Sequence, residues 1–207
     1  PELLCKDLGE VFYGDVVVKP WSHCRETHPS IDACMQIVGA HDIDPEQVAK
    51  VVIHTTPRTA QGFVGQPFEI GEDPQVSGAF SIIYTAAVAI ATKSVRPDSM
   101  NREAMEDPAL KRLVEKIEIA PTLAPDEYQT AEADIVMEDG AAYHARCDVP
   151  KGDIYKSPMS EEEVLDKFYR NIEFSQTLSR ADADRVVGIV SRLEELDDIG
   201  ELIAFMR

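Results

Sequence analysis

The chain has 207 residues, of which 44% are hydrophobic and 28% are charged, a composition typical of an ordered globular protein of one compact domain. Its 38 acidic residues outnumber 20 basic ones and give a formal net charge of −18. This charge repels a polyphosphate backbone, so we expect no nucleic-acid partner. A site for an anionic ligand must therefore be locally cationic.

Neither a membrane segment nor a cysteine framework is expected. The longest apolar run, residues 79–91, is shorter than the roughly 20 residues that cross a bilayer. The four cysteines form no CxxC pair, which argues against a disulfide scaffold and structural zinc and favours free thiols in a reducing cytosol. The chain begins with Pro1 and has no signal-peptide pattern, so we expect a cytoplasmic protein and a chain cut from something longer.

The first third predicts strand, helix and strand. The β-branched run in "GDVVVKP" favours a short buried strand that ends at Lys19, because Pro20 cannot continue a ladder. From residue 27 the apolar positions recur every three or four residues, with Pro29 in the first turn and Gly39 as a stop. Residues 48–57 again have the β-branched character of a strand.

The middle of the chain predicts a loop, two helices and a hairpin. Residues 58–78 are rich in Gly and Pro and favour a long irregular loop. Residues 80–92 are apolar nearly all round, which is typical of a central helix, and residues 107–117 favour an amphipathic helix. Two strand-like runs surround the "EDG" of residues 138–140, a hairpin signal.

The last fifty residues predict helices that begin at two capping-box patterns, "SEEE" from Ser160 and "SRAD" from Ser179. Each helix carries an apolar stripe, for which we expect core packing. The stripes are Leu165, Phe168, Tyr169 and Ile172, and then Val186, Val187, Val190 and Leu193. The whole pattern predicts an α+β fold, a single domain with a small mixed or antiparallel sheet packed by several helices.

One segment, "KPWSHCRETHPSID" from residue 19 to residue 32, concentrates reactive side chains. A metal site would use His23, Cys24 and His28, but their spacing matches no standard ligand pattern, so no metal is predicted. A cysteine nucleophile would be Cys24, with His23 and Arg25 as its cationic neighbours. In the plainest interpretation these side chains pack at a strand-to-helix turn. A lysine, an arginine and a histidine near a helix N-terminus also suit a carboxylate.

The segment, together with the later "AFSIIYTAAVAI" and the "VMEDGAAYHARCDVPKGDIYKSPMSEEEVLDKF" block, resembles the C-terminal domain of the MmgE/PrpD family. The resemblance spans essentially the whole chain, residues 1–207. Family members are about twice as long and carry a helical N-terminal domain, which we expect to lie outside this chain or on a separate one. The resemblance also implies a homodimer.

What the resemblance implies is chemistry without a cofactor on small di- or tricarboxylic acids, at a cleft between the two domains. Lys19 matches the family's active-site lysine. Cys24 falls where the decarboxylase branch has a catalytic histidine, a departure that argues against that branch, and His23 lies beside it. We therefore name Lys19, Cys24 and His23 as catalytic candidates, and Arg25 and His28 as substrate-binding candidates. Arg58 and Lys93 are further cations that position alone does not separate from solvated charges.

The hypotheses that follow belong to two classes. The first is a hydro-lyase of the 2-methylcitrate dehydratase type that removes a proton α to a carboxylate, with an epimerase or isomerase as its variant. The second is a non-catalytic module that binds a carboxylate or completes a separate helical partner. In either case we expect this chain by itself to hold only half of an active site and to have negligible activity.

Overall fold

The computed structural model describes residues 6, 9, 10 and 17–206. The predicted first strand falls partly outside them, and its described end, Val17 to Lys19, has no strand structure. Val17 is 46% exposed. The prediction was wrong here because β-branched residues form a strand only beside a partner strand. The backbone N–H of Val18 donates to the carbonyl oxygen of Gly152 at 3.2 Å, but no described strand pairs with this segment.

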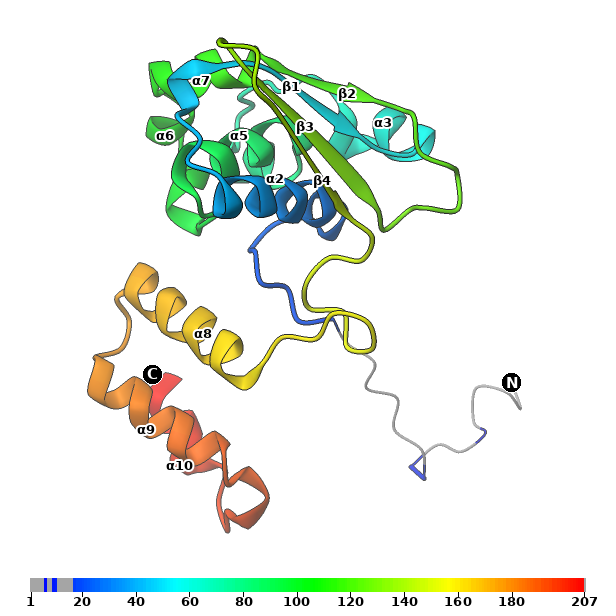
Figure 1. The fold of residues 1–207 in the computed structure, drawn as a ribbon. Coiled ribbons are helices and arrows are strands. Elements are labelled where there is room, and N and C mark those ends of the chain that lie inside the picture. The colour runs from blue at the N-terminus through cyan, green and yellow to red at the C-terminus, as the bar shows by residue number, and fades with distance from the viewer. Residues whose placement is uncertain (1–5, 7–8, 11–16, 207) are drawn as a thin grey trace.

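A four-stranded mixed sheet forms the centre of the fold, in the order β2-β1-β3-β4 (Figure 1). Its strands are β1 (Val48–His54), β2 (Ile117–Ala120), β3 (Ala131–Met137) and β4 (Ala142–Cys147). β1 pairs parallel with β2 and antiparallel with β3, and β3 pairs antiparallel with β4. The predicted hairpin is thereby confirmed, and the turn passes through Gly140 at a φ of +87°.

One face of the sheet is covered by helices and the other is open. α2 (His28–Ala40) packs on β3 and β4, and α5 (Ile82–Thr92) packs on α2, α7 and β2. The parallel pairing of β1 and β2 requires a crossover, and that crossover contains the short α3 and α4, then α5, α6 and α7. The bounds of these shorter helices are α3 (Pro57–Gln61), α4 (Pro74–Ala79), α6 (Arg102–Glu106) and α7 (Pro108–Val114).

The core lies between this helical layer and the sheet. Ile31 of α2, Ile53 of β1, Ile90 of α5 and Ile135 of β3 are fully buried in it. The helix predicted from residue 27 to a stop at Gly39 is confirmed as α2, and those predicted at residues 80–92 and 107–117 are confirmed as α5 and α7. The predicted irregular loop of residues 58–78 was wrong in part, because α3 covers its beginning and α4 its end. Both begin at proline and are capped by a preceding Thr or Asp side chain.

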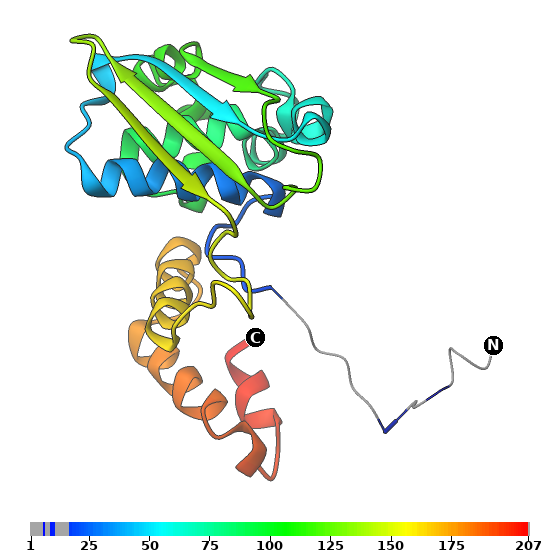
Figure 2. The same ribbon diagram turned by 45° about the vertical axis from the view of Figure 1, so that its right-hand side comes forward.

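The last helices lie apart from the sheet, beyond the segment that follows β4 (Figure 2). They are α8 (Glu161–Ser175), α9 (Arg180–Val190) and α10 (Gly200–Ile203). Ser160 forms the predicted capping box with Glu163. The core packing predicted for their stripes was mostly wrong: no residue of α8 is buried, and Val190 is 50% exposed. Helices without a second layer over them leave such stripes half-covered.

None of the helices in the described part of the chain combines the length and apolar character needed to cross a membrane. The structure is thus an α+β domain, as the sequence predicts, with one mixed sheet packed by helices on one face.

Candidate functional site

The five candidate residues occupy the entry to α2. Lys19 lies exposed before it, and its Nζ donates to the carbonyl oxygen of His23 at 3.0 Å. Cys24 begins the one-turn helix η1 (Arg25–Thr27), which runs directly into α2 at His28. The backbone N–H of Cys24 donates to the carbonyl oxygen of Ala79 at the end of α4, at 2.9 Å. This bond fixes the entry segment to the crossover.

His23 and His28 are buried histidines with unsatisfied ring nitrogens. His23 is 2% exposed and His28 is fully buried. Neither ring nitrogen of His23 has a hydrogen-bond partner among the described residues, and neither does Nε2 of His28. Buried polar atoms normally have partners, so each such atom requires an explanation. One explanation is a group that this chain does not itself supply.

Burial keeps both imidazoles neutral. Desolvation, followed by the charge of Lys19, lowers the pKa of His23 to about 4. Desolvation, followed by the charge of Arg25, lowers the pKa of His28 to about 3. Nη1 of Arg25 lies 3.4 Å from Nδ1 of His28, and a guanidinium can only donate. Nδ1 therefore accepts, and the neutral His28 carries its hydrogen on Nε2.

Arg25 clamps two distant parts of the chain together. Its Nη1 donates to the carbonyl oxygen of Lys151 at 2.6 Å, and its Nη2 donates to that of Pro150 at 2.8 Å. Asp32 of α2 reinforces the junction, because its carboxylate accepts from the indole Nε1 of Trp21 at 2.9 Å and from the backbone N–H of Lys151 at 2.8 Å. Burial raises the pKa of Asp32 although these bonds oppose the shift. The substrate-binding role of Arg25 stays a prediction.

Cys24 is the most accessible of the three described cysteines, and all three are free thiols. Cys34 and Cys147 are buried, and desolvation raises the pKa of each to about 12. Such thiols are unreactive at neutral pH. Cys5 lies outside the described residues. Access thus distinguishes Cys24 from the others, and its catalytic role, like that of Lys19, stays a prediction.

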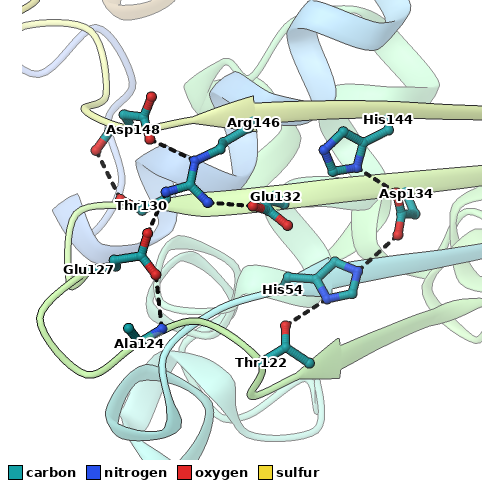
Figure 3. A network of polar contacts seen from close by, with 10 residues as sticks. All are labelled: His54, Thr122, Ala124, Glu127, Thr130, Glu132, Asp134, His144, Arg146 and Asp148. Atoms are coloured by element: carbon teal, nitrogen blue, oxygen red, sulfur yellow. Dashed lines mark hydrogen bonds and ion pairs between the residues drawn. The ribbon is translucent and has the colours of Figure 1, made fainter.

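A second polar network, which the sequence interpretation missed, covers the open face of the sheet (Figure 3). Asp134 accepts from Nε2 of His54 at 2.9 Å and from Nδ1 of His144 at 2.7 Å. Nδ1 of His54 lies 2.8 Å from the hydroxyl of Thr122. The alternation of β3 and β4 places these side chains on the solvent face. The alternation along each strand predicts which side chains share the solvent face, but it identifies the contacts between strands only once the strand pairing is known.

The same network continues to Arg146 of β4. Its guanidinium bonds three carboxylates, those of Glu127, Glu132 and Asp148, and these bonds tie the loop before β3 to the sheet. Among the residues that the structure describes, no three His, Cys, Asp or Glu side chains lie close enough to hold a metal ion. The geometry here is that of structural ion pairs on a solvated face.

The fold and the entry segment together define the class of protein: an α+β domain whose buried histidines and cations gather where the chain enters α2. The chain matches the MmgE/PrpD C-terminal domain over residues 21–194, and it belongs to that family. His23, Cys24, Arg25 and His28 lie inside the matched residues, and Lys19 lies two residues before them. A search of curated proteins gave no match.

Proposed function

We propose that this chain is the C-terminal part of a cofactor-independent hydro-lyase of the 2-methylcitrate dehydratase type. Its substrate is a small di- or tricarboxylic acid. A base removes the proton α to a carboxylate, the carbon–hydroxyl bond at the neighbouring carbon breaks, and an acid protonates the departing hydroxyl to give water and an alkene. Membership of the family supports a dehydratase-like protein.

The observation that carries the proposal is the buried His23, whose two ring nitrogens have no hydrogen-bond partner among the described residues. General-base catalysis requires a neutral imidazole with a free lone pair. The lowered pKa of His23 keeps it in this form at neutral pH, and neither of its ring nitrogens is engaged by another group among the described residues. A bound substrate that brings hydroxyl and carboxylate groups to these nitrogens would also remove their desolvation penalty.

Positive charge for the reaction comes from the same segment. Removing an α-proton builds negative charge on the carboxylate as an enediolate, and a fixed cation stabilises that charge. Lys19 is exposed and is held by the carbonyl oxygen of His23. It can bind the carboxylate or transfer the proton, and Cys24, next to His23 in the sequence, is a further catalytic candidate.

The proposed enzyme needs a second half. We propose that a helical domain, on the same or a separate chain, supplies the remaining acid and base groups and covers the entry segment, and that the complete protein is a cytoplasmic homodimer. This chain alone should then turn over no substrate. Robust activity of the purified 207 residues would contradict the two-part site, and a monomer by light scattering of the complete protein would contradict the dimer.

The test is Lys19→Ala in the complete protein, with Lys111→Ala as the matched control. Lys111 is an exposed lysine of α7 with no side-chain partner among the described residues. We expect kcat/KM to fall at least about 10²-fold for Lys19→Ala, the low end for loss of a positioned acid or base. We expect no change for the control. An unchanged rate in Lys19→Ala removes Lys19 from the mechanism.

Two alternatives share this geometry. Because both Nη groups of Arg25 already donate to backbone carbonyls, the segment also suits a structural or carboxylate-binding module without catalysis. An epimerase or isomerase would share the α-proton removal. Incubation of the complete protein with substrate in deuterium oxide separates them: water loss identifies a hydro-lyase, deuterium exchange without water loss an epimerase or isomerase, and neither a binding module.

A further inference from the structure

A cationic groove lies between α8 and the α2–α5 side of the fold. Its narrower part is a cavity of about 220 Å³ lined by Trp21, Arg96, Lys151, Lys167 and Arg170 among others. A wider, more open part continues past Lys93 and shares Trp21, Arg96 and Arg170 with the first. None of the five candidate residues of the entry segment lines either part.

The charge of this groove is opposite to that of the chain. The narrow part is lined by four cations and two carboxylates, those of Glu163 and Asp166. The wide part is lined by three cations and one carboxylate, that of Asp98. In a chain of formal net charge −18, cations gathered in a concave region focus a positive field that attracts small anions.

Not all of this charge is neutralised within the chain. Lys151 pairs with Glu163 at 2.9 Å, and Arg96 lies 3.6 Å from Glu173, so that two ion pairs join α8 to the rest of the fold. Arg96 also lies 3.8 Å from Asp98, and Lys93 lies 3.3 Å from Asp42. Arg170 pairs with Asp166 one turn away on α8. Lys167 has no ion pair in the part of the chain that the structure describes, and it is half-buried beside the cavity. Its charge is free for a ligand.

We propose that this groove is a binding site for a small anion with two or more negative charges, held by Lys167 and Arg170 of α8 together with Arg96. The narrow part, at about 220 Å³, suits a small ligand, because cavities for drug-sized molecules measure about 300–1,000 Å³. A polycarboxylate or a phosphate suits the narrow part. Since the ligand would bridge α8 and the sheet-bearing part of the chain, its binding would fix the position of α8.

Trp21 makes the proposal directly measurable. It is the only tryptophan of the chain, it lines both parts of the groove, and its indole is held by Asp32 at 2.9 Å. Its fluorescence therefore responds to binding in the groove, and a Lys167 variant distinguishes this from binding at Lys19, two residues away in the sequence. The titration uses the 207-residue chain with citrate, with inorganic phosphate, and with potassium chloride at matched ionic strength.

We expect a saturable change in Trp21 emission with citrate or phosphate and none with potassium chloride, because screening alone is not saturable. Lys167→Glu should weaken binding at least about tenfold, and Arg170→Ala should weaken it as well. The control is Lys111→Glu, the same charge reversal on α7, which should leave the affinity unchanged. A melting curve of each variant without ligand verifies that it is folded.

The two ligands also identify the source of the anion. Citrate binding at least about tenfold tighter than phosphate supports an organic polycarboxylate, and the reverse supports a phosphate. Absence of saturation with both ligands overturns the proposal, as does equal affinity of Lys167→Glu and the unchanged chain. The proposal is independent of the dehydratase activity, because the titration requires no turnover.

Discussion

Arg25 donates to the carbonyl oxygen of Lys151 at 2.6 Å across 126 positions of sequence. With the bond to Pro150, it joins the segment that leads into α2 to the segment that leads out of β4. The bond from Val18 to Gly152 and the bond from Lys151 to Asp32 lie at the same junction. The candidate site is therefore built where these two segments run side by side.

Replacing Arg25 by lysine should weaken this junction. A single ammonium cannot reproduce the forked donation to two carbonyl oxygens, and hydrogen bonds to charged groups contribute about 1.5–3 kcal/mol each. We expect Arg25→Lys to lower the free energy of unfolding by about 1–3 kcal/mol in urea. Arg192→Lys, at an exposed arginine without a side-chain partner among the described residues, should change it little. Equal stability of the two variants would show that the clamp is not structural.

The buried histidines predict loss of stability in acid. Their folded pKa values, about 4 for His23 and about 3 for His28, lie below the unfolded value of about 6.5. Between these limits the unfolded chain binds protons that the folded chain refuses, so stability falls as the pH falls from about 6.5. The slope is about 1.4 kcal/mol per pH unit for each histidine.

His28→Gln should reduce that slope by about 1.4 kcal/mol per pH unit, the contribution of one proton. This holds whatever the effect of the substitution on stability at neutral pH. His41→Gln, at an exposed histidine, is the matched control and should keep the slope of the unchanged chain. The measurement is urea unfolding at half-unit intervals from pH 7 to pH 4. An identical slope in His28→Gln would mean that His28 takes up its proton in the folded state as readily as in the unfolded one.

Alanine substitutions at Gly152 and Gly140 distinguish the cost of steric crowding from the cost of a left-handed backbone. Both glycines have positive φ, +93° and +87°. A Cβ at Gly152 would lie 1.8 Å from the carbonyl oxygen of Val18, whereas one at Gly140 would meet nothing within 4 Å. We expect Gly140→Ala to lose about 1–2 kcal/mol, the cost of left-handed backbone. Gly152→Ala should lose at least about 3 kcal/mol, because the junction must also move apart.

Chemical denaturation of both variants measures this difference. Equal losses would indicate that residues 18 and 152 separate without cost, and hence that the entry and exit segments are not held together.

Asp134 and His144 provide a test of the network on the open face. Desolvation raises the pKa of Asp134, but the hydrogen bonds from His144 and His54 outweigh it, and the net shift is downward. Its contribution to stability is therefore present above the unfolded pKa and is lost as the pH falls through the folded one. Because His144 is 56% exposed, a double-mutant cycle with Asp134→Ala and His144→Ala should give only about 0.2–1 kcal/mol at pH 6.

The cycle of Asp134→Ala with Lys111→Ala, which lies on α7, should be additive. A coupling above about 2 kcal/mol for Asp134 with His144 would show that this face is desolvated by something other than the described residues.

Local pattern determined much of the secondary structure. The 3.6-residue period located α2 and α7, the apolar run located α5, and the "EDG" turn located the hairpin of β3 and β4. These signals succeed because helix faces, caps and tight turns depend on residues only a few positions apart. The same local reasoning was wrong at Val17 to Lys19, because a strand needs a partner from elsewhere in the chain.

The sequence by itself also determined the family, through the closely spaced residues from Lys19 to Asp32, and it named the candidate residues. Only the tertiary structure decided how they are used: that His23 and His28 are buried with unpartnered nitrogens, and that Arg25 holds Pro150 and Lys151. It alone brought His54 to Asp134 and placed Lys167 and Trp21 around one cavity. Burial and contacts between distant segments arise from packing of the whole chain, and no local pattern encodes them.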